Sequence, residues 1–354
     1  TACKLTKYNA AGDNVEDSIV TEGSSLITIV GALDVDNICS NDASNNICYG
    51  LNVGGGGIAN TSIGCCAANA MSTGFNNVAI GPASMKAANG VCCNVAIGVN
   101  AAEDLTTGGD DNVAIGTFAM LNGTTTTDSV AIGKCSMGVG VTTGACNVAI
   151  GFETMKNTTS GCNNTAVGGF SMAANATGEF NTSLGFKSLC SIVGGDRNVA
   201  VGNTAGKSIT SGCDNVAIGH NALCSSANGC FNVAIGIKAA SATTSGTNNV
   251  VLGDCASSGN TTGSHNVTIG SQAGFYALSG DHNLGIGQFA LYDNWGGDYN
   301  TALGSAAMQC NTTGSNNAAL GYRAMMNNTT GNDNFAVGEC ALQSNVNGIG
   351  NTAL

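Results

Sequence analysis

The sequence predicts an all-β fold, a parallel β-solenoid (a β-roll or β-helix) built from coils of 17 residues. Three observations predict it. The string NVAIG recurs along the chain, its copies are evenly spaced, and small residues dominate the composition, with 53 Gly and 1 Pro. One coil alone cannot bury its apolar side chains, whereas stacked coils share a continuous core.

The spacing of the repeat is the main evidence for one repeat per coil. We take the asparagine of NVAIG as position 1, and residues at this position stand at 60, 77, 94, 112, 129, 147, 164, 181, 198, 215, 232, 249, 266, 283, 300, 317, 334 and 351. The steps are 17 residues except for two steps of 18, from 94 to 112 and from 129 to 147. At about 4.8 Å per coil, seventeen coils predict a rod of roughly 80 Å.

Positions 2 to 4 predict a short strand followed by a corner. Position 4 is Ile, Val or Leu in all eighteen copies, and position 2 is mostly Val or Thr. Because alternate residues of a strand share a face, we expect positions 2 and 4 to point into the core and position 3 to point outward. Position 5 is Gly in all seventeen complete copies, which predicts φ > 0 or a close backbone approach. This glycine excludes a helix, since it interrupts any 3.6-residue stripe.

Two rows of side chains are expected to run along the stack. Position 1 is Asn except at Ser129, and stacked asparagines form ladders of amide hydrogen bonds. Position 9 is Met or Leu in eleven copies, including Met85, Met155, Leu223 and Met325, and is expected to fill the same core from a second short strand after the glycine corner. A polar turn, often TTG, then closes the coil. Two copies represent the predicted core ladder: Asn77, Ile80, Gly81, Asn215, Ile218 and Gly219.

Position 3 predicts an oligomer. It is Ala in thirteen of eighteen copies and is never Lys, Glu or Gln, although a solvated outward position would accept these residues freely. Close packing against another chain explains the restriction, most simply in a homotrimer around the rod axis. The alternative is a narrow monomeric coil in which both strand faces are internal.

The repeat does not include the start of the chain. Residues 1–45 carry an acidic stretch and a strand-like run, SLITIVG at 25–31, and are expected to form a β cap or the end of a preceding domain. Residues 46–354 are assigned to the repeat solenoid, with NICYG at 46–50 as a degenerate first coil. The repeat is expected to continue beyond the last residue.

Composition and motifs argue against several classes of protein. The net charge is −12 and no basic stripe is present, so nucleic acid is not an expected partner. No apolar run approaches the roughly 20 residues of a membrane helix. The chain lacks the usual nucleophile, metalloprotease and nucleotide-binding motifs. We therefore expect no enzyme, no catalytic residue and no cofactor.

Two sets of residues are candidates for a metal or for glycans. His265 and His282 each precede position 1, one repeat apart, and with Asp281 beside them are weak candidates for Zn, Ni or Fe. The alternative is two solvated turn residues. The sequence also holds Asn–x–Ser/Thr sequons that we expect in turns open to glycosylation. These candidates are Asn122, Asn157, Asn175, Asn260, Asn311 and Asn328.

The 17 cysteines suggest disulfides in an oxidising compartment. Cys213 and Cys230 lie two residues before position 1 in adjacent coils, so stacking places their Cα atoms about 4.8 Å apart, within the range for a bond. Cys146 and Cys162 lie in neighbouring coils but are offset by one position. The alternative is that the cysteines are small buried apolar residues.

The repeat resembles two groups of surface proteins. NVAIG with a TTG turn is similar to the head repeat of the YadA-type trimeric autotransporter adhesins. The NTALG…AL…NTTG pattern, carried by Asn300–Leu303, Ala307–Met308 and Asn311–Gly314, resembles repeats of viral tail-fibre-like proteins. The resemblance covers residues 60–354 and implies a trimeric, left-handed parallel β-roll or β-helix on a virion or cell surface.

These features together suggest an extracellular or virion-surface fibre shaft or adhesin that presents or spaces a receptor-binding surface. The expected partners are further copies of the chain and a host-surface glycan or protein, with no membrane span. One alternative is a structural, self-assembling filament that binds no receptor. A further alternative is an ice-binding solenoid, because Thr pairs recur in the turns.

Overall fold

The structure is a computed structural model that describes residues 4–8, 14–19, 47–49, 57–138 and 141–354. The chain divides into two compact units, Thr1–Asn41 and Asp42–Leu354. In the first unit β1 (Lys4–Tyr8) pairs in antiparallel fashion with β2 (Asn14–Ile19). The strand expected at residues 25–31 lies outside the described residues.

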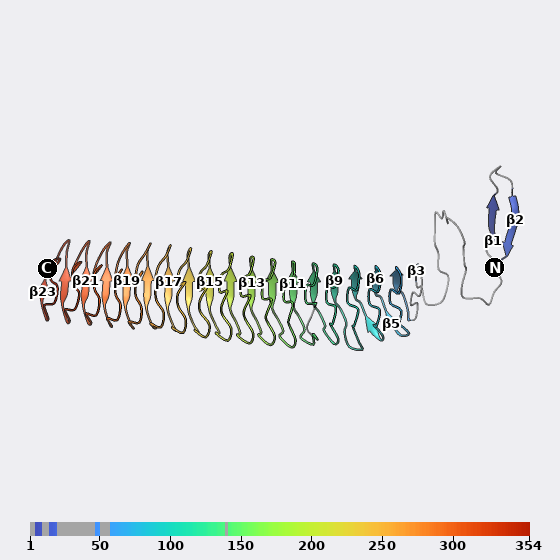
Figure 1. Cartoon of the computed structure of the whole chain (residues 1–354), viewed down its shortest axis with the longest axis horizontal. Helices are drawn as coiled ribbons and strands as arrows, with labels where there is room; N and C mark the ends of the chain where they lie inside the picture. Colours follow the sequence, from blue (N-terminus) through green and yellow to red (C-terminus); the bar gives the residue numbers. More distant parts are fainter. Residues whose placement is uncertain (1–3, 9–13, 20–46, 50–56, 139–140) are drawn as a thin grey trace. The chain divides into compact units, whose positions relative to one another are not determined.

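The second unit is a stack of coils, each of which adds one short strand to a parallel sheet (Figure 1). The strands of this sheet are β3 (Ile47–Tyr49), β4 (Thr61–Ile63), β6 (Val78–Ile80), β8 (Val95–Ile97), β9 (Val113–Ile115), β10 (Val130–Ile132), β11 (Val148–Ile150), β12 (Thr165–Val167), β13 (Thr182–Leu184), β14 (Val199–Val201), β15 (Val216–Ile218), β16 (Val233–Ile235), β17 (Val250–Leu252), β18 (Val267–Ile269), β19 (Leu284–Ile286), β20 (Thr301–Leu303), β21 (Ala318–Leu320), β22 (Phe335–Val337) and β23 (Thr352–Ala353). A second ladder joins β5 (Gly74–Phe75) to β7 (Val91–Cys92).

The strands pair in register, with each position of the repeat against the same position of the next coil. Val216 pairs with Val233, and Ala217 pairs with Ala234. The 18-residue step keeps this register, because Val95 pairs with Val113, so the turns absorb the extra residue. Ile47 of β3 pairs with Thr61, so residues 47–49 form a strand of the same sheet, within the expected degenerate first coil. The predicted all-β parallel solenoid is confirmed, and the described residues contain no helix.

The two faces of the strand are the reverse of the sequence prediction. Position 3 points into the coil, where Ala217 is 0% exposed, whereas Ile80 and Ile218 at position 4 are only half-buried. The interior is narrow, because residues at positions 8 and 9 lie just across from the strand. At Gly285, a position-3 glycine, an added Cβ would lie 3.3 Å from Cδ1 of Leu291 at position 9. Only small side chains fit there, so the larger ones face outward.

The small residues at position 3 therefore do not indicate an oligomer. Position 3 is restricted by the interior of its own coil and needs no neighbouring chain to explain it. The alternative of two internal faces is also wrong, since only one face of the strand is internal and positions 2 and 4 remain partly exposed.

Three rows of side chains fill the interior opposite the strand. The expectation that position 9 fills the core is confirmed, because Met85, Met155, Leu223 and Met325 are fully buried. The second strand expected there is wrong, since these four residues lie in turns and take positive φ. Position 8 adds a row of Ala, Ser and Thr, and position 12 adds a row that includes Leu105. The hydroxyl of Ser136 at position 8 donates at 2.8 Å to the carbonyl of Ala149 in the strand of the next coil. The rows at positions 8 and 12 were not predicted from the sequence.

The position-5 glycine has both properties expected of it. Gly81 has φ of 123°, and a Cβ added there would lie 2.7 Å from the carbonyl oxygen of Gly98 in the next coil. Non-glycine residues at positions 7, 9 and 17 also take positive φ, as at Lys238 (54°), Met155 (49°) and Asp214 (58°). The positive φ values at positions 7, 9 and 17 turn the backbone sharply, which lets the chain close a coil within 17 residues. These turns were not predicted from the sequence.

The asparagines at position 1 form the predicted ladder. Asn215 is buried, and its Nδ2 donates both to Oδ1 of Asn198 at 3.0 Å and to the carbonyl of Gly229 at 2.7 Å. Its own Oδ1 accepts the backbone N–H of Asn232 at 3.0 Å. Each asparagine thus joins two coils and also closes its own. At Ser129 the hydroxyl replaces the amide as acceptor for the N–H of Asn147 at 3.1 Å.

Candidate functional site

The outward side chains at positions 2 and 4 form a continuous apolar strip along the sheet, which we call the outer strip. None of its eighteen copies carries a charged residue. Apart from Leu354 in the last copy, its most exposed large members, at 36% to 49% of their surface, are Ile47, Ile63, Ile97, Ile150, Leu184, Ile235, Ile269, Ile286 and Phe335. Contiguous apolar surface on this scale marks an interaction site.

The size of the outer strip matches a protein–protein interface. At about 4.8 Å per coil the strip is roughly 80 Å long, and three strand residues make it about 10 Å wide. Its area is therefore about 800 Å², which is what each partner contributes to a stable interface of ordinary size.

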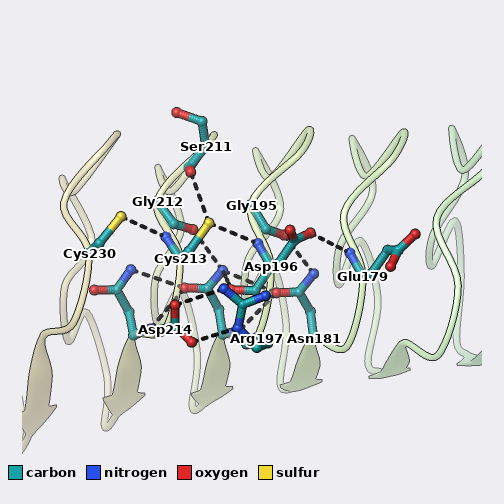
Figure 2. A network of polar contacts seen from close by, with 12 residues as sticks. Glu179, Asn181, Gly195, Asp196, Arg197, Ser211, Gly212, Cys213, Asp214 and Cys230 are labelled. Carbon is teal, nitrogen blue, oxygen red and sulfur yellow. Dashed lines mark hydrogen bonds and ion pairs between the residues drawn. The ribbon is translucent and has the colours of Figure 1, made fainter.

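A second row, at position 16, links the coils through side-chain acceptors (Figure 2). The backbone N–H of Glu179 donates to Oδ1 of Asp196 at 2.9 Å. The N–H of Asp196 donates to Sγ of Cys213 at 3.4 Å, and the N–H of Cys213 donates to Sγ of Cys230 at 3.1 Å. Asp, Ser, Asn and Cys are interchangeable here because each offers an acceptor to the preceding coil.

Position 17 lies beside this row and is solvent-facing. Nε and Nη2 of Arg197 contact the two carboxylate oxygens of Asp214 in the next coil, at 2.7 and 2.9 Å. The guanidinium lowers the pKa of Asp214 mainly through the hydrogen bond. Identical positions of adjacent coils are therefore close enough for bidentate ion pairing.

The cysteine candidates have the predicted register. Cys213 and Cys230 stack in adjacent coils, and their sulfur atoms point the same way in Figure 2, each toward the preceding coil. Both are free thiols here, so the disulfide stays a prediction. Cys146 and Cys162 are also free, and burial raises the pKa of the Cys162 thiol.

The geometry of His265 and His282 argues against a shared metal ion. Their rings stack with centroids 4.7 Å apart and planes within 2°. The lone pair of an imidazole nitrogen lies in the plane of its ring, so a metal ion bound at about 2 Å lies in that plane as well. One ion bound by a nitrogen of each histidine would have to lie in two separate parallel planes at once. Tyr299 continues the stack at 4.8 Å from His282. Among the described residues no group of three His, Cys, Asp or Glu side chains gathers for a metal.

Most of the glycan candidates prove to be interior residues. Asn175, Asn260, Asn311 and Asn328 stand at position 12 and are 0–1% exposed, so the expectation that they lie in open turns is wrong. Nδ2 of Asn328, for example, donates to Oδ1 of Asn311 at 2.9 Å. This second ladder could have been found from the 17-residue spacing of these asparagines. Of the remaining candidates, Asn157 is exposed and Asn122 is half-buried.

Comparison with known proteins adds no assignment. No protein-family model and no curated protein matches the chain. In the described part of the chain no helix is long and apolar enough to cross a membrane.

Proposed function

We propose that this chain is a shaft segment of an extracellular or virion-surface fibre, and that it assembles with copies of itself through the outer strip. The observation that carries the proposal is the strip itself. Position 4 is Ile, Val or Leu in all eighteen copies, neither position 2 nor position 4 carries a charge in any copy, and the strip runs along the whole sheet. Covering about 800 Å² of such a surface removes from water the side chains that the coil is too narrow to bury.

A second copy of the chain is the partner that fits this surface best. The strip repeats with the rise of the coils, so its ridges and grooves are matched along the whole length only by a partner with the same rise. An identical solenoid has that rise. A globular partner would cover only a part of the strip.

We propose three copies, because the repeat resembles that of trimeric surface adhesins. In a threefold bundle the three strips face a common axis, and each touches both neighbours. The other walls of the coil then face outward. These walls vary from coil to coil, as at position 17, which holds Arg197, Phe231, His265 and Tyr299 in different copies. Such variation suits a surface that meets other molecules, and a filament without a receptor is the alternative.

The strip can be tested by charge. In the double variant Val216→Glu and Ile218→Glu, two carboxylates would face the axis in each chain, and we expect the assembly to dissociate to chains of 34.8 kDa. The matched control places two Glu at exposed turn residues, Asn228 and Thr244. Sedimentation velocity measures both. A wild-type protein that sediments as a single chain, or a strip variant that stays assembled like the control, would refute the proposal.

A further inference from the structure

The wall opposite the strand carries a trough of about 360 Å³. Its lining includes Asn221, Lys238, Ser241, Cys255, Ser258 and Phe275, which stand at positions 7 and 10 of four consecutive coils. Because positions 8 and 9 point into the core to meet the strand, positions 7 and 10 lie on the outer surface of the far wall. The trough therefore stays open when the outer strip is covered.

The trough arises from the sizes of the residues at position 10. Three small side chains, Cys224, Ser241 and Ser258, follow one another at this position, and Phe275 stands there in the next coil. Phe275 stacks on Tyr292 at 5.3 Å with the ring planes within 9°, and the ring of Tyr276 packs edge-on at 4.6 Å. The three small residues form the floor of the trough, and the ring of Phe275, packed against the two tyrosine rings, forms one end wall.

The charge of this wall differs from that of the rest of the chain. In the four coils that line the trough, positions 6 to 11 carry one lysine, Lys238, and one carboxylate, Asp254, and the two preceding coils add Lys187 and Lys207 at these positions. The whole chain has a net charge of −12. Lys238 lines the trough, is exposed, and makes no ion pair with any other described residue. The ammonium of Lys238 is therefore available to an anionic ligand on an otherwise acidic protein.

We propose that the trough binds an acidic glycan, a sugar chain that carries a carboxylate. The sugar's apolar face packs on the ring of Phe275, its hydroxyls pair with Ser241, Ser258 and the amide of Asn221, and its carboxylate pairs with the ammonium of Lys238. Three coils of floor span about 14 Å, the length of a short oligosaccharide. This inference rests on the proposed function as a surface fibre, and it names the class of receptor.

The test is titration calorimetry of the full chain with sialyllactose, trigalacturonate and neutral lactose. The two acidic probes separate a sialic acid from a uronic acid as the source of the carboxylate. We expect at least one of them to bind and lactose to bind at least about tenfold more weakly, since a hydrogen bond to a charged group contributes about a factor of ten or more.

Variants localise the binding. Lys238→Gln removes the charge from an exposed side chain and should weaken the acidic probe about tenfold or more, whereas Lys134→Gln, an exposed lysine on another coil, should leave it unchanged. Ser241→Leu should block the floor. No binding by either acidic probe, equal binding of lactose, or equal affinities of the two lysine variants would overturn the proposal. Sedimentation of the same samples reports assembly separately, so loss of binding and loss of the trimer are distinguishable.

Discussion

The position-1 ladder makes a graded prediction about stability, because the chain holds a natural exception to it. Replacing Asn215 with Leu keeps the volume roughly constant but removes the acceptor of the Asn232 N–H and the donor to the Gly229 carbonyl. Each of these buried groups then stays unpaired at a cost of about 1–3 kcal/mol. We expect Asn215→Leu to lower the free energy of unfolding by about 2–6 kcal/mol.

Asn215→Ser is the matched variant, since Ser129 shows that a hydroxyl at this position still accepts the N–H of the next coil, at 3.1 Å to Asn147. Only the Gly229 carbonyl then loses its partner, so the expected cost is about 1–3 kcal/mol. Urea unfolding gives the overall change, and native-state hydrogen exchange at the Asn232 amide gives the local one. Because repeat proteins unfold in parts, the local measurement decides. Equal protection of Asn232 in the Leu and Ser variants would refute the ladder as a source of stability.

Three further predictions follow from other rows. Ala217→Glu places a charge at a fully buried position of a narrow coil and should unfold that coil whether or not the chain is assembled. Circular dichroism and limited proteolysis measure this unfolding. A variant that folds but fails to assemble would contradict the assignment of position 3 to the interior of the coil. At position 16, Cys230→Asp should preserve thermal stability while Cys230→Val lowers it, because only Asp restores an acceptor for the Cys213 N–H; equal melting temperatures would show that the acceptor is dispensable. Because the pKa of Asp214 is lowered, its ion pair with Arg197 stabilises the fold at pH values above the ordinary carboxyl pKa of about 3.9, and this stabilisation is lost as the pH falls further. The difference in melting temperature between wild type and Arg197→Gln should therefore disappear in acid. A difference that persists there would contradict this assignment.

Much of the solenoid is readable from the sequence because its constraints repeat. The 17-residue spacing, the glycine corner, the asparagine ladder and the core row at position 9 each depend on one residue type that recurs at one position. The structure confirms each of them at particular residues, as at Gly81, Asn215 and Met155.

The faces of the strand were assigned the wrong way because periodicity does not say which face is internal. Positions 2 and 4 share a face, but in a coil this narrow the larger side chains, such as Ile218, have no room inside, and the methyl group of Ala217 does. The restriction of position 3 to small residues was the available signal. The acceptor row at position 16 was missed for another reason, since Asp196, Cys213 and Ser264 share a function without sharing a chemical class.

We expect the outer strip, which holds the larger side chains of the strand, to face further copies of the same chain. Cryo-electron microscopy of the wild-type particle tests this expectation most directly, because a cross-section of the rod shows how many coils are present and which wall of each faces the axis. We expect three coils, with β15 and its neighbouring strands turned toward a common axis and the Lys238 trough on the outside. A single isolated coil, or coils that meet through the walls at positions 7 to 17, would contradict it.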